Sequence, residues 1–206
     1  MKALLINGSP HTNGCTYTAL SEVAKELEAA GIETEIVTVG NKDIRGCISC
    51  RKCKETGKCV FNDLVNEVAP KFAEADGIVI GSPVYFAGPN GNLISFLDRL
   101  FYSCPCDRRM KVGAAVTSAR RAGTTATFDV LNKYFTISEM PIASSRYWNN
   151  VHGYTPEDVH ADEEGTQVMQ MLGRNMAFLM KSIALGKEQI GLPERPEKIQ
   201  MTNFIR

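Results

Sequence analysis

Short apolar runs alternate along this chain with longer segments whose apolar residues recur at helical spacing. Two of the runs are Ala3–Ile6 and Gly77–Ile80, and Leu20, Val23 and Leu27 illustrate the helical spacing between them. Short apolar runs bounded by turn residues are typical of strands buried on both faces. The alternation therefore predicts an α/β fold, in which helices joined by right-handed crossovers cover both faces of a parallel sheet.

The pattern predicts five such alternations. Strands are expected near residues 3–6, 33–39, 77–80, 112–116 and 141–147. Helices are expected near residues 16–30, 63–75, 90–102, 125–135 and 163–185. We expect residues 1–186 to form one domain with a cysteine-rich insertion at 47–59. Residues 187–206 are expected to form a tail that is either loosely held or packed on another subunit.

A polar loop, Asn7–Thr16, joins the first strand to the first helix. The first amides of a helix lack partners within the helix and sit at the positive end of its dipole, so they bind anions. The loop lacks the glycine patterns of dinucleotide and P-loop sites. Its many side-chain donors suit one terminal monophosphate, as in FMN, better than NAD or ATP. An ordinary helix-capping turn uses the same residue types and is the alternative. The donors are Ser9, His11, Thr12, Asn13 and Thr16.

Two further polar loops, Ser82–Asn90 and Thr117–Thr124, also follow predicted strands. Open parallel sheets bind ligands at the carboxyl ends of their strands, so the three loops should converge on one crevice. Pro83, Tyr85 and Phe86 offer rigid and aromatic surface for a flat ring, and amides near Val84 could bind its polar edge. The alternative is that these aromatic side chains close the core.

The third loop carries two adjacent arginines, Arg120 and Arg121, beside Ser118 and Gly123. Guanidinium groups could stabilise a reduced anionic flavin or hold the phosphate of an incoming nucleotide. A solvated surface is the alternative interpretation.

Charge and hydropathy exclude two classes of partner. Of 206 residues, 23 are basic and 23 acidic, which argues against a nucleic-acid or membrane surface as the main partner. No apolar run approaches the roughly 18 residues of a membrane span, and the apolar start of the chain is too short for a signal peptide. We therefore expect a cytoplasmic protein.

Four of the seven cysteines fall within thirteen residues, as Cys47-x2-Cys50-x2-Cys53-x5-Cys59. Consecutive C-x2-C steps let one turn present several thiolates to a single centre, which is typical of iron-sulfur ligation. Free or disulfide-forming thiols are one alternative. Zinc, which usually takes two separated C-x2-C pairs, is another. Neighbouring lysines would offset the charge of an anionic cluster.

The remaining cysteines have other settings. Cys104 and Cys106 follow a predicted helix and are expected to be packing residues, although a C-x-C pair could be redox-active. Cys15 sits at a predicted helix N-terminus, where its thiol could be acidified. A small residue that keeps the loop compact is the other interpretation of Cys15.

Three motifs together carry a resemblance: Gly8-Ser9-Pro10, Gly81-Ser82-Pro83-Val84-Tyr85 and Phe96-Leu97-Asp98-Arg99. They resemble the NADPH-dependent FMN reductase family of flavodoxin-like proteins, and the compact cysteine motif resembles its iron-sulfur flavoprotein branch. The resemblance implies a flavodoxin-like three-layer fold with a five-stranded parallel sheet of order 2-1-3-4-5. It also implies FMN phosphate at the first loop and the flavin ring at the other two. His11 stands where the family often has arginine.

These observations lead to one leading prediction, an FMN-dependent oxidoreductase that moves electrons between NAD(P)H or a protein donor and an acceptor. A [4Fe-4S] cluster on Cys47, Cys50, Cys53 and Cys59 would take part. A cluster-free NAD(P)H-dependent FMN or quinone reductase and a non-catalytic flavodoxin-like carrier are the alternatives. We also expect a homo-oligomer, because Tyr85, Phe86 and Trp148 suit burial better than water. The predicted cofactor-binding residues are Ser9, His11, Asn13, Gly14, Cys15, Thr16, Pro83, Val84, Tyr85, Phe86, Ser118, Arg120, Arg121 and Gly123.

Overall fold

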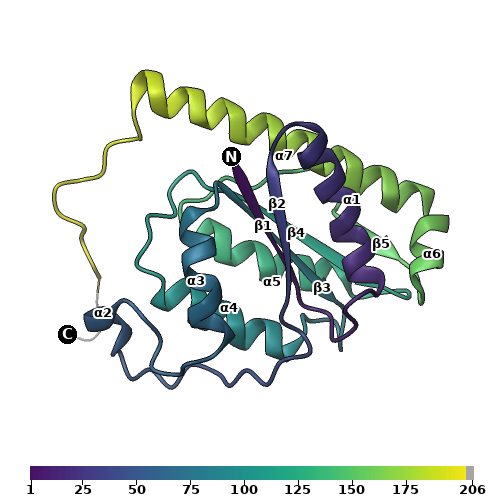
Figure 1. Ribbon diagram of the computed structural model, residues 1–206, viewed down its shortest axis with the longest axis horizontal. Helices are drawn as coiled ribbons and strands as arrows, with labels where there is room; N and C mark the ends of the chain where they lie inside the picture. The colour runs from purple at the N-terminus through teal and green to yellow at the C-terminus, as the bar shows by residue number, and fades with distance from the viewer. Residues whose placement is uncertain (203–206) are drawn as a thin grey trace.

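A five-stranded parallel sheet forms the centre of the protein in a computed structural model that describes residues 1–202 (Figure 1). The strand order is β2-β1-β3-β4-β5, which confirms the predicted flavodoxin-like order. The strands are β1 (Lys2–Asn7), β2 (Glu33–Thr38), β3 (Gly77–Pro83), β4 (Val112–Ala119) and β5 (Asn150–His152).

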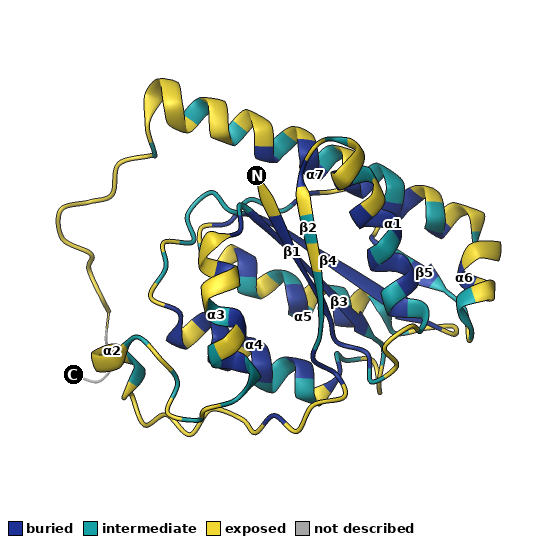
Figure 2. Cartoon of the chain, in the orientation of Figure 1, coloured by how far each residue is buried: buried dark blue, intermediate teal, exposed yellow. Residues whose placement is uncertain are grey.

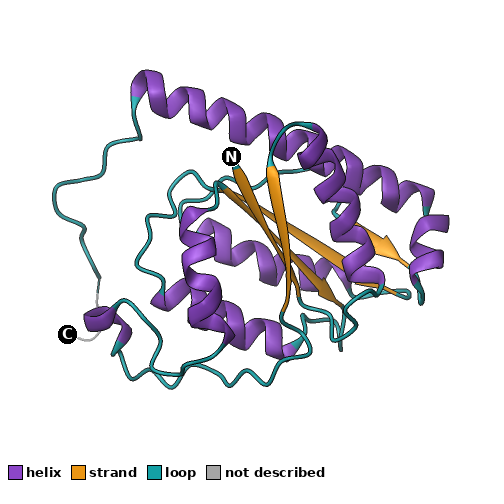
Figure 3. Cartoon of the chain, in the orientation of Figure 1, coloured by secondary structure: helices purple, strands orange, loops and turns teal. Residues whose placement is uncertain are grey.

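Helices cover both faces of this sheet (Figure 3). They are α1 (Cys15–Ala29), α2 (Cys53–Thr56), α3 (Leu64–Glu74), α4 (Gly91–Ser103), α5 (Thr124–Thr136), α6 (Pro156–Ala161) and α7 (Glu163–Ile190). Helices α1 and α7 pack together on one face, and α3, α4 and α5 cover the other. The result is the three-layer arrangement that the alternating pattern predicts.

The core lies on both sides of the three central strands, which are almost wholly buried (Figure 2). On one face Leu20 and Leu27 of α1 meet Met176 of α7 against the sheet. On the other face Phe72 and Phe96 pack with neighbouring aliphatic side chains. Because apolar residues of each strand point alternately to the two faces, a continuous apolar run such as β3 supplies both cores at once.

The predicted fifth strand, residues 141–147, is wrong. Only Ile142 makes a bridge to the sheet, opposite Gly113, and the strand that pairs with β4 is Asn150–His152. Residues 141–143 make backbone hydrogen bonds only to Gly113 among the described residues, and the chain returns to β4 at buried Asn149. There the amide of Thr117 donates to the carbonyl of Asn149 at 2.9 Å, and the side-chain amide of Asn149 donates to the carbonyl of Ala115 at 3.1 Å.

Several predicted boundaries also move. Strand β4 continues to Ala119, so Ser118 lies in the strand and not in the loop that follows it. Helix α7 runs to Ile190 and ends at Gly191, whose φ of 77° suits glycine. The first residues of the expected tail, 187–190, are therefore helical. Helices α2 and α6 were not predicted. The last residues of the expected tail, 203–206, lie outside the described residues.

Within residues 1–202, no helix is both long enough and apolar enough to cross a bilayer.

Candidate functional site

The β1–α1 loop leads into a helix N-terminus that no side chain caps within the described part of the chain. The N-cap residue of α1 is Gly14, it makes no side-chain cap hydrogen bond, and the first turn holds no acidic residue. Exposed helix amides without a competing carboxylate form a ready anion site.

Asn7, fully buried at the end of β1, holds this loop in place. Its Oδ1 accepts from the amide of Ser9 at 3.1 Å, and its Nδ2 donates to the Oγ1 of Thr38 at 3.2 Å. The amide of Gly8 donates to the carbonyl of Gly81 at 2.8 Å. A Cβ on Gly8 would lie 2.8 Å from the carbonyl oxygen of Gly81, so only glycine lets the loop approach β3 this closely. The loop is thus fixed by the two central strands beneath it.

A cleft of about 730 Å³ opens above this loop at the carboxyl ends of the strands. Three segments predicted to meet there do meet: the β1–α1 loop, the end of β3 and the end of β4. The lining residues are Ser9, His11, Thr12, Asn13, Gly14, Cys15, Thr16, Pro83, Val84, Tyr85, Ser118, Ala119, Arg120, Gly153, Tyr154, Thr155 and Pro156. Of the last four, Gly153, Tyr154 and Thr155 belong to the β5–α6 loop, and Pro156 begins α6.

The β5–α6 loop is absent from the sequence-based prediction because the fifth strand was expected too early in the chain. A signal for it was present. Thr155 and Asp158 form a capping box around Pro156, and this combination marks a helix start. A helix start directly after a strand would have placed a fourth loop at the same edge of the sheet.

Buried hydroxyl groups join two of the segments across the cleft floor. The Oγ atoms of Thr16 and Ser118 lie 2.8 Å apart, and both residues are buried. Ser9 is buried as well, and its Oγ accepts from the amide of His11 at 3.1 Å. The hydroxyl proton of Ser9 therefore remains available to a ligand.

Three of the predicted cofactor residues lie outside the cleft lining. Phe86 is fully exposed in a tight turn, in which the amides and carbonyls of Tyr85 and Gly88 pair at 2.9 Å. Gly123 packs behind that turn, since a Cβ there would lie 2.8 Å from Val84. Arg121 is exposed beside it. The turn is thus held from behind while its aromatic tip faces outward.

Cys15 does not have the acidified thiol that its place at a helix N-terminus suggested. Burial raises the pKa of Cys15, and nearby Asp158 and Glu157 act in the same direction. Its Sγ lies 3.7 Å from the carbonyl of Gly153. The structure therefore favours the alternative, a small residue that keeps the loop compact.

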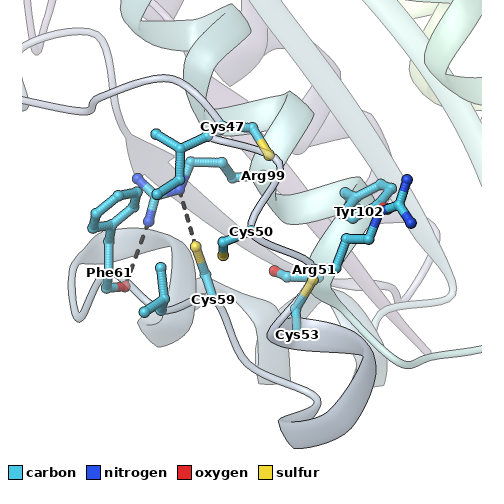
Figure 4. A pocket seen from close by; sticks show the side chains of 11 residues that line it. Cys47, Cys50, Arg51, Cys53, Cys59, Phe61, Arg99 and Tyr102 are labelled. Carbon is cyan, nitrogen blue, oxygen red and sulfur yellow. Dashed lines mark hydrogen bonds between the residues drawn. The ribbon is translucent and has the colours of Figure 1, made fainter.

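The four clustered cysteines line a second pocket together with Arg99 and Tyr102 of α4 (Figure 4). Cys47 and Cys50 are exposed, and Cys53 and Cys59 are half-buried. Ser49 and Arg51, which alternate with them, have φ values of 54° and 60°. The side chains share the pocket, but within residues 1–202 no three histidine, cysteine, aspartate or glutamate side chains are close enough to hold a metal ion.

A buried arginine anchors this pocket. Arg99, on α4, is 1% exposed and makes two hydrogen bonds to the carboxylate of Asp63, at 2.6 and 2.8 Å. Its Nε donates to the Sγ of Cys59 at 3.2 Å, and its guanidinium lies 5.0 Å from the centre of the Phe61 ring. Burial disfavours the charge, but the hydrogen bonds to Asp63 and Cys59 more than offset it and raise the pKa of Arg99.

The side chains of the cleft and those of the second pocket each offer donors for the group that the sequence predicts there, FMN for the cleft and an iron-sulfur cluster for the pocket. The cleft combines an uncapped helix N-terminus, buried hydroxyls and an aromatic wall, and this chemistry matches a phosphate joined to a flat ring. The second pocket supplies four sulfur donors from a single segment, as an iron-sulfur cluster requires. The Sγ of Cys59 in that pocket accepts a hydrogen bond from Arg99, as cluster ligands commonly do from neighbouring donors.

Comparisons with known proteins agree with this geometry. The sequence profile described as "NADPH-dependent FMN reductase" matches residues 1–155. An iron-sulfur flavoprotein of Methanocaldococcus jannaschii is 35% identical over 194 residues, covering 89% of this chain and 99% of the relative. Another, from Methanosarcina thermophila, is 27% identical, covering 92% and 100%. An archaeal flavodoxin structure superimposes with a TM-score of 0.58 at 16% identity, covering 88% of this chain and 99% of the flavodoxin. This chain belongs to the NADPH-dependent FMN reductase family and has the flavodoxin-like fold.

Proposed function

We propose that this protein is an FMN-dependent oxidoreductase that moves electrons between NAD(P)H or a protein donor and an acceptor. The observation that carries the proposal is the cleft at the carboxyl ends of β1, β3 and β4, with the uncapped N-terminus of α1 at its floor. This is where open parallel sheets bind their ligands.

The residues of the cleft have distinct proposed roles. The first amides of α1, with the hydroxyls of Ser9 and Thr16, would hold the phosphate. Tyr85 and the neighbouring end of β3 would lie along the ring. Arg120, exposed at the mouth, would place positive charge where a reduced flavin or an incoming nucleotide phosphate is negative. Bound FMN would supply the exchange between two-electron and one-electron chemistry.

We further propose that Cys47, Cys50, Cys53 and Cys59 hold a [4Fe-4S] cluster. Support comes from the shared pocket, from the names of the two relatives and from the spacing of the motif. Arg99 would donate to the ligating sulfur of Cys59, which stabilises negative charge on it. Among the described residues, no three of these cysteine side chains are close enough together to hold a metal ion. This observation favours the cluster-free reductase as the second candidate.

The released cofactor is expected to be FMN and not FAD, because the loop offers one phosphate site and lacks the glycines needed beside a pyrophosphate. Mass analysis of the cofactor released by heat decides between them. Steady oxidation of NADPH or NADH by the FMN-loaded protein, with a quinone or free flavin as acceptor, is the expected activity. FAD in the cleft contradicts the loop argument, and FMN without turnover supports the flavodoxin-like carrier.

Anaerobic reconstitution with iron and sulfide should yield one [4Fe-4S] cluster per chain, detected by iron analysis and by EPR after reduction. Cys50→Ala should lose it, because a cubane cluster normally uses four thiolates. Cys104→Ser, outside the motif, is the matched control and should keep the cluster. Wild-type protein without iron, or an unchanged cluster in Cys50→Ala, points to the cluster-free reductase.

We also propose that the protein is a homo-oligomer acting in the reducing cytoplasm, where its free thiols persist. Trp148 is 53% exposed and Phe86 is wholly exposed, and large apolar side chains at the surface suit burial against another subunit. Light scattering of the FMN-loaded protein should therefore report a mass of at least twice the 22.6 kDa of one chain. A stable, flavin-loaded monomer would contradict this prediction.

A further inference from the structure

A pair of thiols outside the four-cysteine motif follows the end of α4, where Pro105 packs against Gly57 of the cysteine-rich insertion. The Sγ atoms of Cys104 and Cys106 lie 2.9 Å apart across Pro105. Cys104 is 5% exposed, Cys106 is half-buried and Pro105 is exposed. Neither sulfur lines the four-cysteine pocket or the cleft. We infer that Cys104-Pro105-Cys106 is a thiol–disulfide exchange site for low-molecular-weight disulfides, with Cys106 attacking and Cys104 resolving.

The two thiols differ in the way that an exchange site needs. Cys106 is the more accessible, and it accepts a hydrogen bond from the thiol of Cys104. That hydrogen bond lowers the pKa of Cys106, and the cations Lys111 and Arg108 act in the same direction against the effect of burial. The same contact, together with burial, raises the pKa of Cys104. Of the two sulfurs, the accessible one is therefore the one whose thiolate is favoured, and the thiolate is the nucleophilic form.

The surrounding contacts hold this arrangement in place. Arg108 donates from Nη1 to the carbonyl of Cys104 at 3.2 Å, and Lys111 donates to the carbonyl of Ala73 at 2.8 Å. The Sγ of Cys104 also lies 3.6 Å from the carbonyl of Ala69 on α3. Within the described residues the Nε of Arg108 is buried and has no hydrogen-bond partner. The two cations are thus tethered next to the sulfur whose charge they favour.

The exchange needs only the two cysteines, the substrate disulfide and water. The Cys106 thiolate attacks one sulfur of a disulfide, forms a mixed disulfide and releases one thiolate, which takes a proton from water. Cys104 then loses its proton to water and attacks Cys106 Sγ. This forms the Cys104–Cys106 disulfide and releases the second thiolate. Two electrons pass from the cysteine pair to the substrate disulfide.

The proximity of the two cysteines in sequence also favours exchange over a structural cross-link. A disulfide across a single intervening residue closes a small ring, and strained disulfides are the readily reduced, labile ones. An excess of a thiol should therefore return the pair to the dithiol form. A structural bridge would instead join distant segments and resist reduction.

The test uses the full-length, FMN-loaded protein and compares two tryptic peptides. Trypsin releases Leu100–Arg108, whose only cysteines are Cys104 and Cys106. After treatment with glutathione disulfide, acid quenching and alkylation with iodoacetamide, this peptide should be unalkylated and lighter by two hydrogen atoms. Excess reduced glutathione should restore the doubly alkylatable form. The peptide Ala3–Lys25 carries Cys15, a thiol of raised pKa, and serves as the slow internal reference.

Two single variants separate the roles of the thiols. Cys104→Ser should trap a stable glutathione adduct on Cys106, because no resolving thiol remains. Cys106→Ser should form an adduct on Cys104 at least about tenfold more slowly, since the remaining thiol is buried and protonated. The proposal is overturned if the wild-type peptide reacts no faster than the Cys15 peptide, or if Cys104→Ser traps no adduct. The wild-type measurement decides the question even where a variant folds poorly.

Discussion

Arg99→Ala should lower the free energy of unfolding by about 3 kcal/mol, because removing one partner of a buried ion pair leaves the other charge unpaired. Asp63 is 27% exposed, so water partly compensates it and the loss falls at the lower end of the usual range. The substitution also removes the hydrogen bond to Cys59 and the contact with Phe61. Urea unfolding followed by circular dichroism measures the loss.

The matched control is Arg174→Ala, which breaks an exposed arginine–carboxylate pair with Glu26 of similar geometry. Surface pairs contribute little, so this variant should unfold almost as the wild type does. Asp63→Asn tests the electrostatic part separately, since an asparagine oxygen can still cap α3 by accepting from the amide of Val65. Equal stabilities for Arg99→Ala and Arg174→Ala would show that the buried pair does not anchor the cysteine-rich loop.

The double variant Ser9→Ala, Thr16→Val is expected to weaken FMN binding at least about thirtyfold. Each buried hydroxyl is a proposed phosphate donor whose removal costs about 1 to 3 kcal/mol. Even the lower value for each gives about 2 kcal/mol in total, which corresponds to that factor in Kd. Titration of the apoprotein with FMN, followed by quenching of flavin fluorescence, measures the affinity.

Thr18→Val is the matched control for this experiment. Thr18 lies on the same helix and is also buried, but its hydroxyl donates to the carbonyl of Gly14 at 3.2 Å and does not line the cleft. Its loss should leave FMN affinity close to that of the wild type. If the double variant binds FMN as Thr18→Val does, the phosphate lies elsewhere and the proposed orientation of the cofactor is wrong.

The sequence alone was enough to predict the strands and helices that have a clear apolar pattern of their own. Strands β1 and β3 were predicted from continuous apolar runs, and α4 from an apolar stripe at helical spacing. Such patterns are local, because each strand or helix must bury its own apolar face. The convergence of three loops followed from topology, since parallel strands share one carboxyl edge. The sheet order came from the resemblance to a known family and was confirmed.

Only the tertiary structure decided the contacts between distant segments. The apolar residues at 141–143 predict a strand, yet they bridge β4 only at Gly113, and the ladder with β4 forms at Asn150–His152. In the sequence, Arg99 belongs to a family motif, but nothing there indicates its role. In the folded protein it lies between Asp63 and Cys59, which are 36 and 40 residues away in sequence. The local sequence pattern indicates which face of a helix or strand is apolar. It does not indicate which polar group of another element will contact a given side chain, because that depends on how the elements pack.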